Sequence, residues 1–179
     1  MLSPLFFQNL KEIIGNKIES KKHKTILEVA DWESVATHCF ESLINFFKNI
    51  DRSRLDSHGI ETIGVVDICW NEYGSNIEVD FMPDNNFEEA FDEGCIMNDS
   101  AIDNRDFFSK YFDVPGEEAW GEIGDDYLAI ITIFFHLTEE IIEKVVEHEA
   151  FKSLPKKSPC HIGFAGFHDE ERTLIHTIS

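Results

Sequence analysis

The segment "IETIGVVDICWNEYGSNIEVDFM", from Ile60 to Met82, decides the class of fold. Its first part, Ile60 to Trp70, is rich in β-branched residues, as strands are. Its last part, "NIEVDFM", alternates apolar with polar side chains, and the intervening "NEYGSN" contains the glycine of a turn. The segment therefore predicts a β-hairpin whose second strand carries Glu78 and Asp80 on its solvent face.

Two later segments extend this pattern. "CHIGFAGF" and "RTLIHTI", separated by residues 168–171, predict a second hairpin at the end of the chain. "YLAIITIFFHL", Tyr127 to Leu137, is apolar on both faces and is ambiguous between a central strand and a buried helix. Its length, the preceding "GDD" and the following Thr138, a good N-cap, favour a strand and then a helix that Pro155 ends.

Helices are predicted mainly before the first hairpin. Ser3 and Pro4 form an N-cap and first-turn pair for a helix over residues 4–14, and residues 16–24 are expected to be a loop. The next helix follows Asp31, its predicted N-cap, because apolar residues recur at three and four positions on one face. These residues are Val35, Ala36, Cys39, Phe40, Leu43, Ile44, Phe47 and Ile50.

The length of 179 residues fits one domain, and the hydrophobic content of 42% supplies a core. Together these elements predict a single α+β domain over residues 1–179. Its sheet is expected to be mainly antiparallel, with about five strands and with helices packed on one side.

Cysteine usage and hydropathy predict a cytoplasmic location. The cysteines are far apart and form no C-x-x-C pair; they are Cys39, Cys69, Cys95 and Cys160. The N-terminal residues show no basic leader before an apolar run, and the longest apolar run is far shorter than the roughly 20 residues that span a bilayer. We therefore expect no membrane association.

The net charge of −20 is concentrated in one part of the chain, which we call the acidic lobe. Residues 78–126 hold sixteen acidic and two basic residues, a net charge of −14. Such a surface repels a phosphate backbone, so direct nucleic-acid binding is disfavoured. The alternatives are a surface that serves solubility alone and a surface whose self-repulsion is relieved by a basic protein partner.

The stretch "DNNFEEAFDEG", Asp84 to Gly94, lies in this acidic lobe and begins like a calcium loop. That interpretation fails, because Glu89 occupies the position of the obligatory glycine and Cys95 the position of the bidentate glutamate. Phe87 and Phe91 are spaced to anchor a short helix, so we expect an ordered segment. The next stretch has similar aromatic anchors, namely Phe107, Phe108, Tyr111, Phe112 and Trp120.

No catalytic motif is present in the chain. There is no G-x-S-x-G, P-loop or G-x-G-x-x-G sequence, and no histidine pair has the spacing of a zinc site. The abundance of carboxylates singles out no general acid. We therefore expect no enzyme, no cofactor and no metal site.

The order of "IGVVDICW", "NIEVDFM", "PGEEAWGE" and "IGFAGFHDEE" after an amphipathic helix resembles that of small acidic bacterial α/β proteins of the toxin-immunity type. The resemblance spans most of the chain. It implies an immunity protein that binds and neutralises a basic, nuclease-type toxin. The alternatives from other classes are a DNA-mimic inhibitor, which would use the same carboxylates, and an uncharacterised enzyme. It identifies neither the partner nor the oligomeric state.

The expected partner-binding residues follow from the acidic lobe. Its carboxylates would speed encounter with a basic toxin domain, and an aromatic side chain among them would anchor the complex. The residues are Glu88, Glu89, Asp92, Glu93, Glu117, Glu118 and Glu122, with Trp120 as the apolar anchor.

Overall fold

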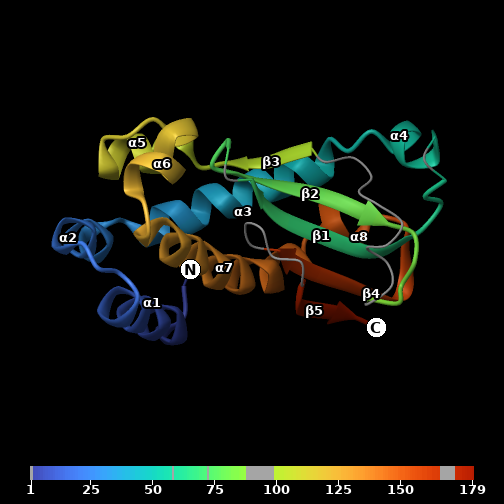
Figure 1. The fold of residues 1–179 in the computed structure, drawn as a ribbon. Coiled ribbons are helices and arrows are strands. Elements are labelled where there is room, and N and C mark those ends of the chain that lie inside the picture. Colours follow the sequence, from blue (N-terminus) through green and yellow to red (C-terminus); the bar gives the residue numbers. More distant parts are fainter. Residues whose placement is uncertain (1, 58, 72, 88–98, 166–171) are drawn as a thin grey trace.

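A computed structural model describes residues 2–57, 59–71, 73–87, 99–165 and 172–179, and Figure 1 shows their arrangement. The helices that precede the sheet are α1 (Pro4–Asn16), α2 (Lys21–Val29), α3 (Trp32–Lys48) and α4 (Arg52–Ser57). The later helices are α5 (Arg105–Phe112), the 3-10 helix η2 (Gly116–Glu118), α6 (Ala119–Ile123), α7 (Asp126–Val145) and α8 (Glu149–Lys152).

The described residues form one five-stranded sheet with the strand order β3-β2-β1-β4-β5. The strands are β1 (Ile63–Asn71), β2 (Asn76–Met82), β3 (Asp99–Asp103), β4 (Lys156–Ala165) and β5 (Thr173–Ile178). Strands β1 and β4 pair in parallel at the centre, and the other neighbours are antiparallel. Both predicted hairpins and the mainly antiparallel α+β class are therefore confirmed. Strand β3 was not predicted from the sequence.

The N-terminal helices begin largely where the sequence predicts. The Ser3 hydroxyl accepts a hydrogen bond from the Phe6 N–H at 3.3 Å, and the Asp31 carboxylate accepts one from Ser34 at 3.1 Å. The loop expected over residues 16–24 is too long, because Ser20 caps a further helix, α2. This helix buries little more than Leu27, which explains its weak apolar pattern.

The prediction of a strand at Tyr127 to Leu137 is wrong, because these residues belong to the 20-residue helix α7. Buried positions recur along the whole helix at three- and four-residue spacing, so one amphipathic period runs through Thr138 without a break. The Thr138 hydroxyl donates to the Phe134 carbonyl at 2.8 Å instead of capping a new helix. Burial of the β-branched side chains outweighs their lower helix propensity.

An aromatic cluster joins the helices to one face of the sheet. The Phe134 ring of α7 lies 5.0 Å from Trp70 of β1 and 5.1 Å from Phe107 of α5. Trp32 of α3 completes the group, with its ring 5.3 Å from Phe107. The indole N–H groups of the two tryptophans have acceptors, since Trp32 donates to the Leu27 carbonyl and Trp70 to the Tyr127 hydroxyl.

The helices pack on one side of the sheet, as predicted. Val66, Ile68 and Trp70 of β1 belong to the same core cluster as the buried residues of α3 and α7, and Figure 1 shows α3 passing behind β2 and β3. The alternate residues of β1 point to the opposite face, which we call the second face. On this face Val65 and Met82 form a separate small cluster.

The carboxylate of Asp126, the first residue of α7, ties that helix to the segment before α2. It accepts backbone hydrogen bonds from Glu19 at 2.6 Å and Ser20 at 3.1 Å, and the His23 Nδ1 lies 2.8 Å away. Burial opposes ionisation of Asp126, but these hydrogen bonds together lower its pKa below the ordinary value.

We expect Asp126→Ala to lower the free energy of unfolding at neutral pH by about 2 kcal/mol, because partly buried N–H donors lose their acceptor. Since the pKa is lowered in the folded state, the contribution of Asp126 is present above the ordinary aspartate pKa of about 3.9 and is lost as the pH falls through the folded-state value. Urea denaturation at several pH values measures both effects.

The neighbouring exposed Asp125, whose side chain makes no capping hydrogen bond, is the matched control. Asp125→Ala is expected to change stability by less than about 0.5 kcal/mol. Equal losses in the two variants, or a difference independent of pH, would contradict this role of Asp126.

Candidate functional site

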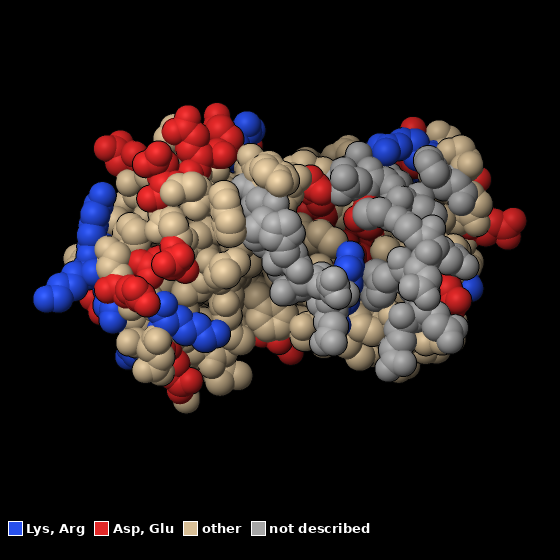
Figure 2. Space-filling model, in the orientation of Figure 1, with Lys and Arg blue, Asp and Glu red and all other residues tan. Residues whose placement is uncertain are grey.

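Exposed acidic side chains gather at the end of the molecule formed by α5, η2 and α6, and Figure 2 shows them as a red group over these helices. We call this surface the acidic corner. It comprises Asp103, Asp106, Asp113, Glu117, Glu118, Glu122 and Asp125. The acidic corner is the described, exposed part of the acidic lobe from the last residue of β3 onward.

Buried aromatic side chains hold the acidic corner in place. Phe107, Phe108 and Phe112 of α5 are buried, as predicted for the anchors of this stretch. A Cβ added at Gly116 of η2 would lie only 2.4 Å from the Arg105 Cγ, so the two segments are in direct contact. The acidic side chains therefore stand on an ordered surface rather than on a tail.

Trp120 is the large apolar side chain of the acidic corner. It is 43% exposed, and its ring packs edge-on against Tyr127 at 5.7 Å. The Tyr127 hydroxyl in turn accepts a hydrogen bond from Trp70 at 3.1 Å, which connects Trp120 to the core. The Trp120 indole is therefore held against a buried tyrosine while it remains partly exposed.

The structure thus brings four of the predicted partner-binding residues onto one surface. They are Glu117, Glu118, Trp120 and Glu122. The other four lie outside the described residues, as does most of the expected helix around Phe91; they are Glu88, Glu89, Asp92 and Glu93.

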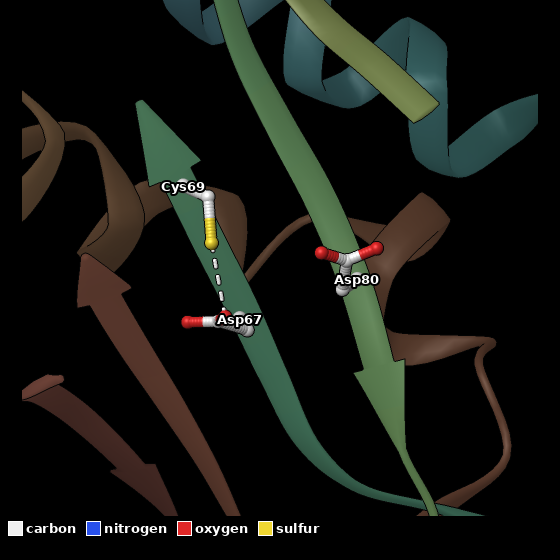
Figure 3. Close-up of side chains that lie close together, drawn as sticks. All are labelled: Asp67, Cys69 and Asp80. Atoms are coloured by element: carbon white, nitrogen blue, oxygen red, sulfur yellow. Dashed lines mark hydrogen bonds between the residues drawn. The ribbon is translucent and has the colours of Figure 1, made fainter. Parts of the chain in front are cut away.

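A second group of polar side chains lies on the second face of the sheet, and Figure 3 shows its members, Asp67 and Cys69 on β1 and Asp80 on β2. Asp67 and Asp80 are directly opposite each other in the strand pairing, and both are 0% exposed. The prediction that Asp80 lies on the solvent face is therefore wrong. We call these three residues the Asp–Cys–Asp cluster.

The second face is covered in part by the chain that follows β2. A Cβ at Gly64 would lie 2.1 Å from the Asp84 carbonyl oxygen, and one at Gly163 would lie 2.9 Å from the Phe87 ring. Asn85 donates a hydrogen bond to the Pro159 carbonyl at 3.3 Å. Residues 83–87 therefore cross from β2 over β1 to β4, in contact with strands that lack side chains at the crossing points.

The environment of the Asp–Cys–Asp cluster favours the neutral forms of Asp67 and Cys69. Burial raises the pKa of Asp67, although a hydrogen bond from Cys69 and the charge of Arg172 oppose this. Burial, together with the Asp67 charge, raises the pKa of the Cys69 thiol. The Sγ–H of Cys69 donates to Asp67 Oδ2 at 2.9 Å, and the Arg172 Nε lies 3.4 Å from the same oxygen.

Two features make the cluster able to hold a cation. The three side chains offer one ligand atom each, and these atoms lie within 4.8 Å of one another. In the described part of the structure, Asp67 Oδ1 is buried and has no hydrogen-bond partner. Sequence reasoning missed this group, although an aspartate and a cysteine two positions apart on a strand share one face.

A groove of about 540 Å³ between α3 and β3 is a poor candidate for acid–base catalysis. The carboxylates that line it are Asp51 and Asp103, and hydrogen bonds from Ser53 and Arg105, respectively, lower their pKa values. A general acid at neutral pH requires the opposite shift.

Comparison of the chain with protein-family models, curated proteins and solved structures gives no match. Among the described helices, none has both the length and the apolar character required to cross a membrane. The basis for inferring function is therefore the chemistry of the acidic corner and of the Asp–Cys–Asp cluster.

We expect Gly64→Ala to destabilise the protein by about 1–3 kcal/mol, because the new Cβ overlaps the backbone of the segment that crosses β1. Thermal unfolding followed by circular dichroism measures the loss.

Gly121→Ala is the matched control, because a Cβ at Gly121 in α6 meets no atom within 4 Å. This variant is expected to be neutral or more stable by up to about 1 kcal/mol, as alanine is favoured over glycine in a helix. A Gly64→Ala variant as stable as the control would show that residues 83–87 do not pack on β1 as described.

Proposed function

We propose that this protein binds and neutralises a basic protein, of the kind represented by nuclease-type bacterial toxin domains, through the acidic corner. The observation that carries this proposal is the half-exposed Trp120, fixed by Tyr127 among exposed carboxylates. Aromatic anchors surrounded by charge are typical of the centres of protein–protein contacts.

The charge distribution supports a basic partner. The seven carboxylates of the acidic corner outnumber the neighbouring basic side chains, Arg105 and Lys110. Arg105 already pairs with Asp103 through its Nε at 2.9 Å. Like charges on a folded surface repel each other, and a basic partner relieves the repulsion. Long-range attraction also accelerates encounter, in a manner that salt suppresses.

The carboxylates and Trp120 are expected to affect different steps of binding. Exposed carboxylates at the rim of an interface act mainly on the association rate. Trp120, by contrast, would lose its remaining exposed surface in the complex and would therefore act mainly on the dissociation rate. This division can be tested with separate variants.

We expect the triple variant Glu117→Lys, Glu118→Lys, Glu122→Lys to associate with a basic toxin domain about 10–100-fold more slowly at low salt. The difference should shrink at high salt, where the attraction is screened. The probe is a purified basic, nuclease-type toxin domain, and stopped-flow fluorescence measures the association rate.

The matched control is the triple variant Glu41→Lys, Glu61→Lys, Glu143→Lys, because it makes the same charge change at exposed positions outside the acidic corner. It should retain most of the wild-type association rate.

Trp120→Ala is expected to raise the dissociation rate about 30-fold, which corresponds to about 2 kcal/mol.

A further readout is the protection of cells that express the toxin domain. Equal protection and equal rates for both triple variants would rule out the acidic corner as the contact surface. Displacement of the partner by duplex DNA would indicate instead that the carboxylates imitate phosphates, as in a DNA mimic.

A further inference from the structure

We propose that Asp67, Cys69 and Asp80 form a binding site for a divalent transition metal ion, with Zn²⁺ as the expected occupant. This site lies on the second face of the sheet and is separate from the acidic corner. It is an addition to the binding function proposed above and does not depend on it.

Strand pairing organises the three ligands before any metal arrives. Asp67 of β1 lies directly opposite Asp80 of β2, and Cys69 follows Asp67 by two residues on the same face. β1 is flanked by strands on both sides, so its backbone is held in place. The ligand atoms therefore remain within 4.8 Å of one another without a flexible loop to gather them.

The burial of two adjacent carboxylates requires compensation by positive charge or by protons. Both aspartates are fully buried, and transfer of a carboxylate from water to the interior is costly unless it is paired. The Arg172 Nε lies 3.4 Å from Oδ2 of Asp67, whereas Oδ1 has no hydrogen-bond partner among the described groups. A dication bound at the cluster would stabilise the ionised Asp67 carboxylate.

The chemistry of the ligands selects the metal. Mg²⁺ and Ca²⁺ prefer sites made entirely of oxygen, whereas a thiolate favours Zn²⁺ and similar softer ions. Zinc binds cysteine sulfur and aspartate oxygen together, and three protein ligands leave a fourth position for water. The Asp–Cys–Asp cluster has this ligand count.

The geometry requires small shifts of the side chains in both directions. Zinc–ligand bonds of about 2.0–2.3 Å in a tetrahedral site separate the ligand atoms by roughly 3.3–3.8 Å. Ligand atoms up to 4.8 Å apart would move closer together, whereas the Cys69 Sγ and Asp67 Oδ2, which are 2.9 Å apart with a proton between them, would move apart. Zinc would replace this proton, so that a Zn–S bond forms and one H⁺ leaves to solvent.

Cobalt(II) is the probe, because its bond to a thiolate gives a near-ultraviolet charge-transfer band that carboxylates alone do not produce. Titration of the full chain with Co²⁺ is expected to give this band at one ion per chain, and Zn²⁺ should bleach it by displacement. Zn²⁺ should also raise the unfolding temperature, since binding stabilises the folded state.

Cys69→Ser should remove the band and weaken zinc binding by at least about 100-fold. The matched control is Cys160→Ala, at a buried cysteine on the helix-covered face. This variant should keep the band. Asp80→Asn, which retains the thiol, keeps the test valid if Cys69→Ser does not fold, and should weaken zinc binding.

Arg172→Gln separates a metal site from a merely structural cluster. The partly exposed guanidinium lies beside Asp67 and repels a cation, so its removal is expected to tighten zinc binding. The proposal is overturned if the wild-type protein gives no thiolate band, if Cys69→Ser retains it, or if Arg172→Gln weakens the binding of zinc.

Discussion

The register of β1 against β2 is the constraint on which the rest of the structure depends. It directs Val66, Ile68 and Trp70 toward the helices, where Trp70 meets the aromatic cluster. The same register places Asp67 opposite Asp80 on the second face. Because side chains alternate along a strand, a shift of one residue would exchange the two sets and bring the carboxylates into the aromatic core. The apolar contacts of one face therefore also fix the polar cluster of the other.

Much of the fold could be predicted from the sequence where a local signal agrees with the tertiary environment. The hairpin turn, the caps at Ser3 and Asp31 and the apolar period of α3 are such signals, and the elements that they predict are present. Helix α7 shows the limit of this reasoning. Its N-terminal half carries apolar side chains at exposed positions too, such as Leu128, so it has no polar face to reveal its period in the sequence. Strand β3 is too short to leave a pattern.

The candidate sites were predictable to different degrees. Trp120 and its neighbouring carboxylates stand out in the sequence because acidic and aromatic residues alternate there, and exposure of the carboxylates follows from charge alone. The Asp–Cys–Asp cluster was missed because alternation of apolar and polar residues, as on β2, ordinarily indicates a strand with one solvent-exposed face. Coverage of that face by residues 83–87 depends on Gly64 and Gly163, which lie about a hundred residues apart in the chain. No local pattern records such a contact, although the hairpin turn alone would have paired Asp67 with Asp80.

The parallel pairing of β1 with β4 has a consequence for the order of folding. Val65 pairs with His161, so the centre of the sheet joins two hairpins that are distant in the chain. Each hairpin can form locally. The two hairpins can pair only after the residues of α5 to α8, which lie between them in the chain, have been synthesised. On the ribosome, β1 therefore emerges long before its central partner and keeps one edge unpaired during that interval. The chain is most exposed to edge-to-edge association at this stage, before β4 closes the sheet.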